Sequence, residues 1–138
     1  MKVTYENSLY YKVLERIRLL PSNVILRSDL MDLAEERQIS RALKKLTTNE
    51  EIIRLGYGVY GRLTRSTRDP SLTYLDGGAL PTVREALNRL NVDWEPSRFE
   101  NDYNSGRSTQ VPANPPTKIK SRFARKLSYD DWEFRVEK

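Results

Sequence analysis

The 138-residue sequence predicts an α+β fold, and three observations support this prediction. First, apolar residues recur at the helical spacing of three and four over residues 36–48. Second, short apolar-rich runs at 52–55 and 59–63 follow directly and are joined by Gly56-Tyr57-Gly58, whose glycines permit the positive φ of a tight hairpin. Third, further helical and strand-like patterns occur near the C-terminus. The order of helix, helix and hairpin near the N-terminus is typical of a winged helix-turn-helix, and a small α+β region with its own β-hairpin completes the chain.

The elements before this helix are predicted from their capping residues. A first helix is expected to follow a loose arm at 1–7 and to begin at Ser8, whose hydroxyl is suited to cap it. Its apolar stripe is expected to pack in the core, with a dimer face as the alternative. A short strand at 23–26 comes next. Ser28 is then expected to cap the second helix, where Asp29 in the first turn favours the helix dipole.

The predicted helix at 36–48 has one apolar and one basic face. No Asp or Glu occurs from residue 37 to the end of this helix. Arg and Gln can read base edges and Lys can hold phosphates, so this composition is expected of a helix in a major groove. A solvated basic face is the alternative, because charge is the default on the outer side of a helix, but the hairpin that follows favours a contact with DNA. The residues predicted to bind DNA are Arg37, Gln38, Arg41, Lys44 and Lys45 on the helix, with Arg54, Tyr57 and Arg62 on the hairpin.

A change of composition follows the hairpin. Residues 64–70, TRSTRDP, are polar and contain a proline, which predicts a linker. The chain is therefore divided into a DNA-binding domain at 1–65 and a small C-terminal α+β region at 66–138, with a possible role in protein interaction. In the second part, the capping-box spacing of Thr82 and Glu85 predicts the start of a short helix.

Charge is unevenly distributed over the C-terminal region. Between Asp69 and Asp102 there are seven acids against three arginines, and such a stretch repels DNA, so we expect it to face protein or solvent. Residues 118–126 instead contain five cations and no acid. Two interpretations stay open for these cations, a solvated strand edge or a contact with phosphates or an acidic partner. Residues 125–129 and 132–136 predict a final hairpin.

The composition excludes several chemistries. With 24 Lys and Arg against 19 Asp and Glu, the chain has a formal charge of +5 and a pI near 9.5, which suits an anionic partner. The absence of Cys and His removes disulfides, thiol catalysis, the usual zinc sites and every His-based triad. No motif suggests catalysis or a phosphate-binding loop, so we expect no enzyme activity, no metal and no cofactor. Because neither a signal peptide nor a membrane-spanning apolar run is present, we expect a cytoplasmic protein without a membrane partner.

Two stretches of the sequence resemble a known family. Residues 24–60, ending in IIRLGYGVY, are similar to the winged-helix domain at the N-terminus of AbiEi-type antitoxins of type IV toxin-antitoxin systems. Residues 103–112, YNSGRSTQVP, resemble the STQVP-containing segment that follows the winged helix in those proteins. The resemblance implies a protein that binds double-stranded DNA, represses its own operon and counters a toxin partner of the nucleotidyltransferase type. Under this reading the partner contacts involve Arg107, Thr109 and Gln110.

The chain departs from this family in length. The full antitoxins continue into a larger C-terminal domain that is responsible for neutralisation. The alternative function is therefore a stand-alone winged-helix repressor of a phage or mobile element, with no toxin partner. Since helix-turn-helix proteins usually read paired half-sites as dimers, a homodimer is a further expectation.

Overall fold

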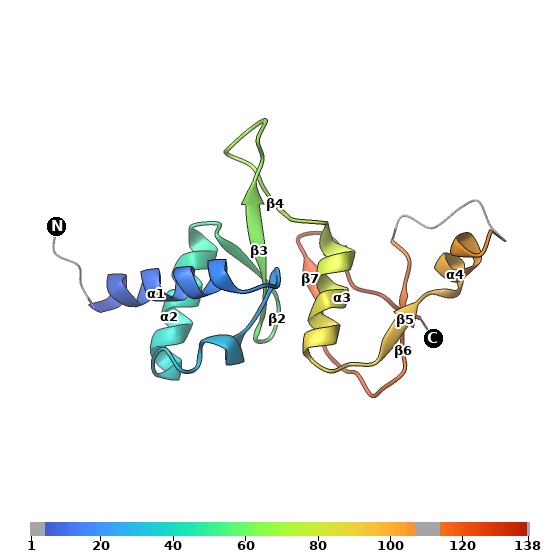
Figure 1. Ribbon diagram of the computed structural model, residues 1–138, viewed down its shortest axis with the longest axis horizontal. Helices are drawn as coiled ribbons and strands as arrows, with labels where there is room; N and C mark the ends of the chain where they lie inside the picture. The colour runs from blue at the N-terminus through green and yellow to red at the C-terminus, as the bar shows by residue number, and fades with distance from the viewer. Residues whose placement is uncertain (1–4, 107–113, 138) are drawn as a thin grey trace.

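The computed structural model describes residues 5–106 and 114–137 and confirms the predicted α+β composition (Figure 1). The N-terminal half contains α1 (Tyr5–Leu19), β1 (Val24–Leu26), the 3-10 helix η1 (Arg27–Leu30), α2 (Glu36–Thr48), β2 (Ile52–Gly56) and β3 (Val59–Arg65). The C-terminal half contains β4 (Thr73–Leu75), α3 (Ala79–Arg89), β5 (Trp94–Pro96), α4 (Arg98–Asn104), β6 (Thr117–Ile119), β7 (Ser128–Tyr129), β8 (Trp132–Glu133) and β9 (Val136–Glu137). The molecule is elongated, with α1 near one end and α4 near the other.

An antiparallel sheet of order β1-β3-β2 lies between α1 and α2 on one side and α3 on the other (Figure 1). β1 shows that both faces of this sheet are covered. Ile25 belongs to the core cluster formed with α1 and α2, whereas Val24 and Leu26 belong to the cluster formed with α3. Alternate residues of a strand point to opposite faces. Because both faces are buried, all three residues of β1 are apolar.

Each face of the sheet has its own hydrophobic core. The cluster on the α1 and α2 side contains Leu9, Val13, Leu14, Ile17, Ile25, Leu30, Ile39, Ala42, Leu43, Leu46 and Ile52. The cluster on the α3 side contains Val24, Leu26, Leu55, Val59, Leu75, Val83, Ala86, Leu87 and Leu127. The second cluster therefore joins strands of the N-terminal half to the C-terminal half, including a residue only eleven positions from the end of the chain.

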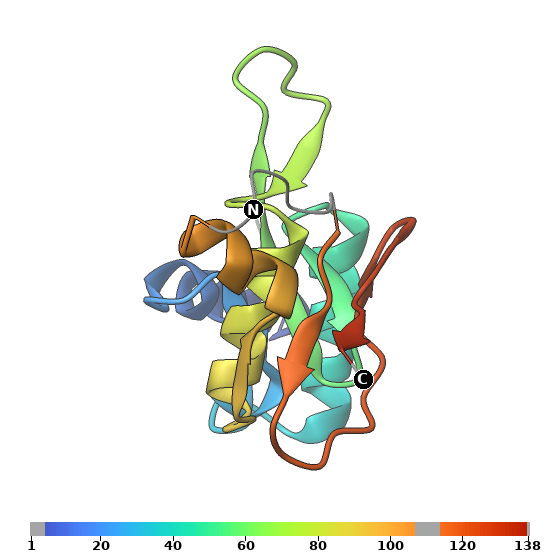
Figure 2. The same ribbon diagram turned by 90° about the vertical axis from the view of Figure 1, so that its right-hand side faces the viewer.

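The segment predicted to be a linker is instead a β-hairpin, so this prediction is wrong. β3 continues to Arg65, which lies opposite Thr73 in the antiparallel pair with β4. The backbone N–H of Ser66 donates to Leu72 O at 2.9 Å. Polar residues and a proline suit the exposed tip of this hairpin, which projects from the body in both views (Figures 1 and 2). The division of the chain at residue 65 therefore falls inside a hairpin.

Two predicted helix starts are also wrong. α1 begins at Tyr5, so Ser8 lies within the helix, and the residues between them include neither Gly nor Pro to prevent this. α3 begins at Ala79 after Gly78, whose φ of 93° is accessible to glycine and strained for other residues. Thr82 is therefore not a cap: it is buried inside α3, and its hydroxyl donates to Gly78 O at 2.7 Å.

The predicted second helix is a single 3-10 turn, η1, and Asp29 rather than Ser28 organises its start. The Asp29 carboxylate accepts a hydrogen bond from Leu26 N at 2.9 Å and bonds from both terminal nitrogens of Arg89 in α3 at 2.6 Å. Burial opposes the ionisation of this carboxyl, but the hydrogen bonds from Arg89 and Leu26 lower its pKa below the ordinary value. η1 is thus anchored to α3, and its residue Leu30 is fully buried.

The C-terminal half forms a smaller sheet of order β5-β6-β9 and a separate hairpin, β7–β8. The hairpin confirms the predicted final turn in a shortened form. The acidic stretch from Asp69 to Asp102 is predicted to face protein or solvent, but one of its acids, Glu100, forms an ion pair within the chain. Arg84 of α3 donates to both oxygens of Glu100 at 2.8 and 2.7 Å. None of the helices within residues 5–106 and 114–137 is long and apolar enough to span a bilayer.

Candidate nucleic-acid interface

The outer face of α2 carries the basic residues that the sequence predicted to contact DNA. α2 forms because its apolar residues pack under α1 and the sheet, which leaves the opposite face in solvent. Arg37, Arg41 and Lys44 are exposed on that face. The acids of this region, Glu35 and Glu36, lie at the start of the helix, where they favour its dipole.

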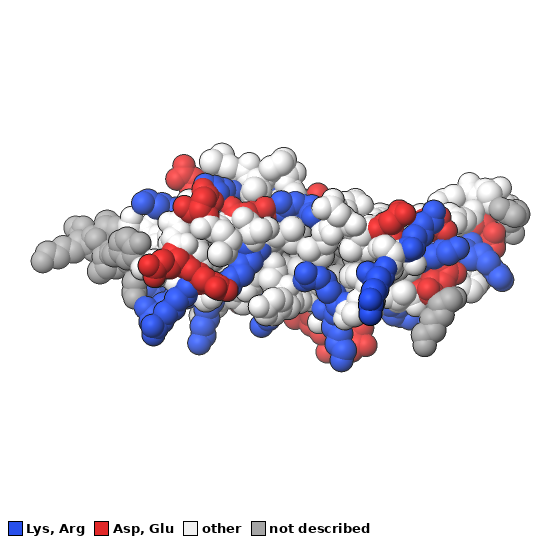
Figure 3. Space-filling view, turned by 90° about the horizontal axis from the view of Figure 1, so that it is seen from below, with Lys and Arg blue, Asp and Glu red and all other residues white. Residues whose placement is uncertain are grey.

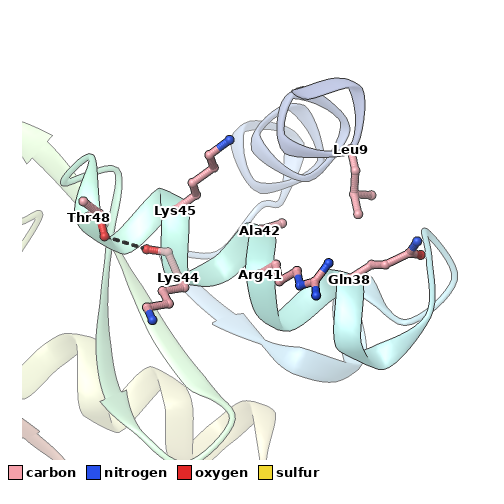
Figure 4. Close-up of a pocket in the computed structure, with 7 residues that line it drawn as sticks. All are labelled: Leu9, Gln38, Arg41, Ala42, Lys44, Lys45 and Thr48. Carbon is pink, nitrogen blue, oxygen red and sulfur yellow. Dashed lines mark hydrogen bonds between the residues drawn. The ribbon is translucent and has the colours of Figure 1, made fainter. Parts of the chain in front are cut away.

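A hollow of about 420 Å³ lies between α1 and the basic face of α2. It is lined by Leu9, Gln38, Arg41, Ala42, Lys44, Lys45 and Thr48 (Figure 4). Gln38 also accepts a hydrogen bond from Glu35 N at 3.4 Å, as part of the first turn of the helix. Gln38 and Lys45 therefore lie toward α1, at the border of the basic face rather than at its centre.

Arg27 ties the β2–β3 turn to the first half of α2. Its backbone N–H donates to Gly58 O at 3.0 Å. Its guanidinium donates to Glu36 O at 2.8 Å and to Ser40 Oγ at 2.5 Å. The turn and the N-terminal half of α2 therefore form one continuous surface. Sequence reasoning missed Arg27, because its partners come from two other elements and no local pattern marks it.

The predicted hairpin residues divide into an exposed and an internal group. Arg54 is exposed, and Tyr57 has 80% of its surface accessible at the turn. Arg62 is half-buried instead, and its guanidinium donates to Leu20 O at 2.9 Å and to Ser22 O. Arg62 thus fastens the loop between α1 and β1, so we assign it a structural role.

Basic side chains extend well beyond α2. Seen from below, Lys and Arg are spread along the length of the molecule, with acidic side chains between them (Figure 3). η1, the β2–β3 turn and the connection from β6 to β7 all reach this underside (Figure 1). The candidate interface is therefore the basic face of α2 with the β2–β3 turn beside it, and further basic side chains lie along the underside of the molecule.

The predicted partner contacts Arg107, Thr109 and Gln110 lie outside the described residues. Within the described part of the chain, no group of three or more Asp or Glu side chains is placed to hold a metal ion. Comparison with protein-family models, curated proteins and solved structures finds no match to this chain. The resemblance to AbiEi-type antitoxins accordingly rests on the two sequence stretches alone.

Proposed function

We propose that this protein is a sequence-specific DNA-binding regulator whose N-terminal half is a winged helix-turn-helix. In this assignment η1 and α2 form the helix-turn-helix, α2 is the recognition helix, and β2–β3 is the wing. The observation that carries the proposal is the acid-free, exposed face of α2, with the β2–β3 turn held against its first half by Arg27. A basic helix beside a hairpin suits insertion into a major groove with contacts to the flanking backbone.

The positions of the side chains suggest different roles in DNA binding. Arg37 and Arg41 lie in the first half of α2, where side chains meet base edges in helix-turn-helix proteins. Lys44, farther along the same face, and Lys45 at its border are assigned to phosphates, together with Gln38 as a polar contact. Exposed Arg54 and Tyr57 are assigned to the sugar-phosphate backbone beside the groove.

The particular regulator that we propose is an AbiEi-like antitoxin, which represses its own operon and counters a nucleotidyltransferase-type toxin. Besides the sequence resemblance, an exposed aromatic pair supports a protein partner: Phe99 and Tyr103 lie one turn apart on α4 and are 49% and 50% exposed. The alternative is a stand-alone repressor of a phage or mobile element. Co-purification of the full chain with a nucleotidyltransferase-like protein encoded beside it favours the antitoxin, and the lack of such a neighbour favours the repressor.

Replacement of Arg41 by Ala tests the DNA-binding proposal. The full-length protein is first used to select its preferred duplex from a random pool, and affinities are then measured for that duplex and for an unselected one. Arg41→Ala is expected to cost about 1 to 3 kcal/mol on the selected duplex, or roughly 5- to 150-fold, and to reduce the preference over the unselected one. Lys44→Ala is expected to weaken both duplexes alike and to shallow the salt dependence by about one unit of slope.

Arg98→Ala is the matched control, because Arg98 is an exposed arginine on α4, at the other end of the molecule. It removes the same charge without touching α2. If Arg41→Ala and Arg98→Ala have equal effects on both duplexes, α2 is not the reading helix. If the full-length protein enriches no sequence from the pool, sequence-specific recognition itself is wrong.

A further inference from the structure

The basic run, defined as residues 118–126, divides into two parts with different surroundings. Its five cations are Lys118, Lys120, Arg122, Arg125 and Lys126. The sequence leaves two interpretations open for these residues, a solvated strand edge or a contact with phosphates or an acidic partner. The structure separates them, because the first two lie at β6 and the other three follow it toward β7.

The two lysines in the first part of the run form ion pairs with an acid of this chain. Lys118 Nζ lies 3.3 Å from Glu95 Oε1, and Lys120 Nζ lies 3.1 Å from Glu95 Oε2. Glu95 is on β5, which pairs with β6 and so holds these groups together. Hydrogen bonds from Lys120 and Lys118 keep the pKa of the Glu95 carboxyl below its ordinary value. These two lysines therefore form a local ion-pair network at the sheet edge.

The second part of the run is docked against the β2–β3 turn. Arg125 Nη1 donates to Tyr57 O at 3.0 Å. The backbone passes so close to Gly56 that a Cβ there would lie 2.7 Å from Lys126 O. Leu127 is buried in the same cluster as Leu55. The segment is thus held beside the turn by a hydrogen bond, a close backbone approach and an apolar anchor.

Docking leaves the charged side chains of this part in solvent. Arg122, Arg125 and Lys126 are all exposed. Neither Arg122 nor Lys126 makes an ion pair with any residue in the two described ranges. Their segment and the β2–β3 turn both reach the underside of the molecule, where basic side chains are spread with acidic side chains between them (Figures 1 and 3).

A chain of hydrogen bonds connects this segment to the recognition helix. Glu36 and Ser40 of α2 bind Arg27, Arg27 binds Gly58 of the turn, and Tyr57 of the same turn binds Arg125. α2 and the C-terminal segment are therefore both linked by hydrogen bonds to the same turn.

We propose that Arg122, Arg125 and Lys126 form a second phosphate-binding surface for duplex DNA, on the side of the β2–β3 turn away from α2. The inference rests on the proposed DNA-binding function and adds to it a C-terminal contact. A duplex that places its major groove on α2 continues past the exposed Tyr57, and the three cations then meet the backbone beyond the turn. Contacts of this kind carry no base preference, so they raise affinity for all duplexes and steepen its salt dependence.

Two double variants with the same loss of charge test this proposal. In Arg122→Ala/Lys126→Ala the proposed phosphate contacts are removed, whereas Lys118→Ala/Lys120→Ala removes the two lysines that share Glu95. Affinity for the selected duplex and for an unselected duplex is measured over a range of salt concentrations with the full-length protein. Circular dichroism and thermal unfolding show whether each variant keeps the fold.

The first double variant is expected to weaken binding to both duplexes by a similar factor and to reduce the salt slope by about two units, since each phosphate contact contributes about 0.9. The second is expected to leave the slope close to that of the parent. Equal losses in both variants would mean that only net charge matters and would overturn the proposal. An unchanged slope in Arg122→Ala/Lys126→Ala, while Arg41→Ala still reduces sequence preference, would overturn the second surface but not the proposed function. If the parent binds no duplex, both fail.

Discussion

Arg54 and Arg62 lie in one hairpin and have the same chemistry, yet their surroundings give them opposite roles. The Arg62 guanidinium donates to the carbonyl oxygens of Leu20 and Ser22 and is half-buried. Moving it to a phosphate would leave those carbonyls without a partner, which costs free energy. Arg54 is exposed, and the only side-chain hydrogen bond that it makes in the described part of the chain is a 3.3 Å contact to Gly56 O, two residues away. A half-buried arginine whose guanidinium is held by two carbonyl oxygens is therefore a poorer candidate contact than an arginine whose guanidinium is exposed.

The surroundings of the two arginines predict that replacing Arg62 mainly lowers stability, whereas replacing Arg54 mainly changes DNA binding. Arg62→Ala is expected to lower the free energy of unfolding by about 1 to 3 kcal/mol and to leave the salt slope of DNA binding unchanged. Arg54→Ala is expected to change stability by less than about 0.5 kcal/mol and to shallow the slope by about one unit. Urea unfolding and salt titration of both variants measure this. If Arg62→Ala instead makes the salt slope of DNA binding shallower and leaves the free energy of unfolding unchanged, Arg62 belongs to the DNA interface.

At the scale of elements, η1 depends on α3 rather than on its own sequence. A four-residue 3-10 turn has little intrinsic stability. Asp29 fixes its start through Leu26 N, and Arg89 of α3 holds Asp29 by two hydrogen bonds and also donates to Val24 O at 3.0 Å. The side chains of this pair are only 14% and 28% exposed, so removing one partner leaves a poorly solvated charge.

Asp29→Asn is expected to lower the free energy of unfolding by about 1 to 3 kcal/mol at neutral pH. Because the folded state lowers the pKa of Asp29, its contribution is present above the unfolded pKa of about 3.9 and is lost as the pH falls through the folded value. The difference between parent and variant should therefore shrink in acid. Urea unfolding at neutral pH and at several acidic values measures this difference.

Asp32→Asn is the matched control for Asp29→Asn. Asp32 also pairs with an arginine, Arg16 at 2.8 Å, but the Asp32 side chain is 65% exposed. Solvent screens such a pair, so its loss should change stability much less. If Asp29→Asn and Asp32→Asn behave alike over the whole pH range, the η1–α3 anchor is not a significant source of stability.

At the scale of the whole molecule, the two halves of the chain are not independent. Leu55 and Val59 of the β2–β3 hairpin pack with Leu75, Val83 and Leu87 from the C-terminal half. Gly61 shows how closely they approach, because a Cβ there would lie 2.6 Å from a methyl carbon of Leu75. The C-terminal half is therefore part of the scaffold that positions α2 and the turn.

A fragment ending at Arg65 is expected to unfold at lower urea concentration than the full chain and without a sharp transition. It lacks the residues that cover one face of the central sheet, and each large aliphatic side chain left exposed forfeits about 1.5 to 3 kcal/mol. Its DNA affinity should fall with its folded fraction. Urea unfolding followed by circular dichroism, with the full chain measured in parallel, tests this. A cooperative transition in the fragment at the midpoint of the full chain would show that the first 65 residues are a self-sufficient domain.

Local patterns in the sequence were sufficient to predict several elements of the fold. The bounds of α2, its buried face and the β2–β3 hairpin agree with the prediction, because helical periodicity and turn glycines act over a few residues. The sequence also marks the exposed basic face, since charged residues opposite an apolar stripe remain in solvent. DNA binding, a toxin partner and the absence of catalysis stay predictions.

Only the tertiary structure decided how these elements are used. Residues 64–70 have the composition of a linker, but pairing of β4 with β3 places residues 64 and 65 in a strand and the residues that follow in the tip of a hairpin. The sequence around Arg62 is that of a surface cation, but carbonyl oxygens of the α1–β1 loop accept hydrogen bonds from its guanidinium. The two parts of the basic run 118–126 differ because Glu95 lies beside the first part and Tyr57 beside the second. For Arg62 and the basic run the deciding partners are distant in the chain, and contacts with distant residues leave no periodic trace in the sequence around the residue concerned. For residues 64–70 the partner strand is nearby, but β4 has only three residues, too few for a clear strand pattern.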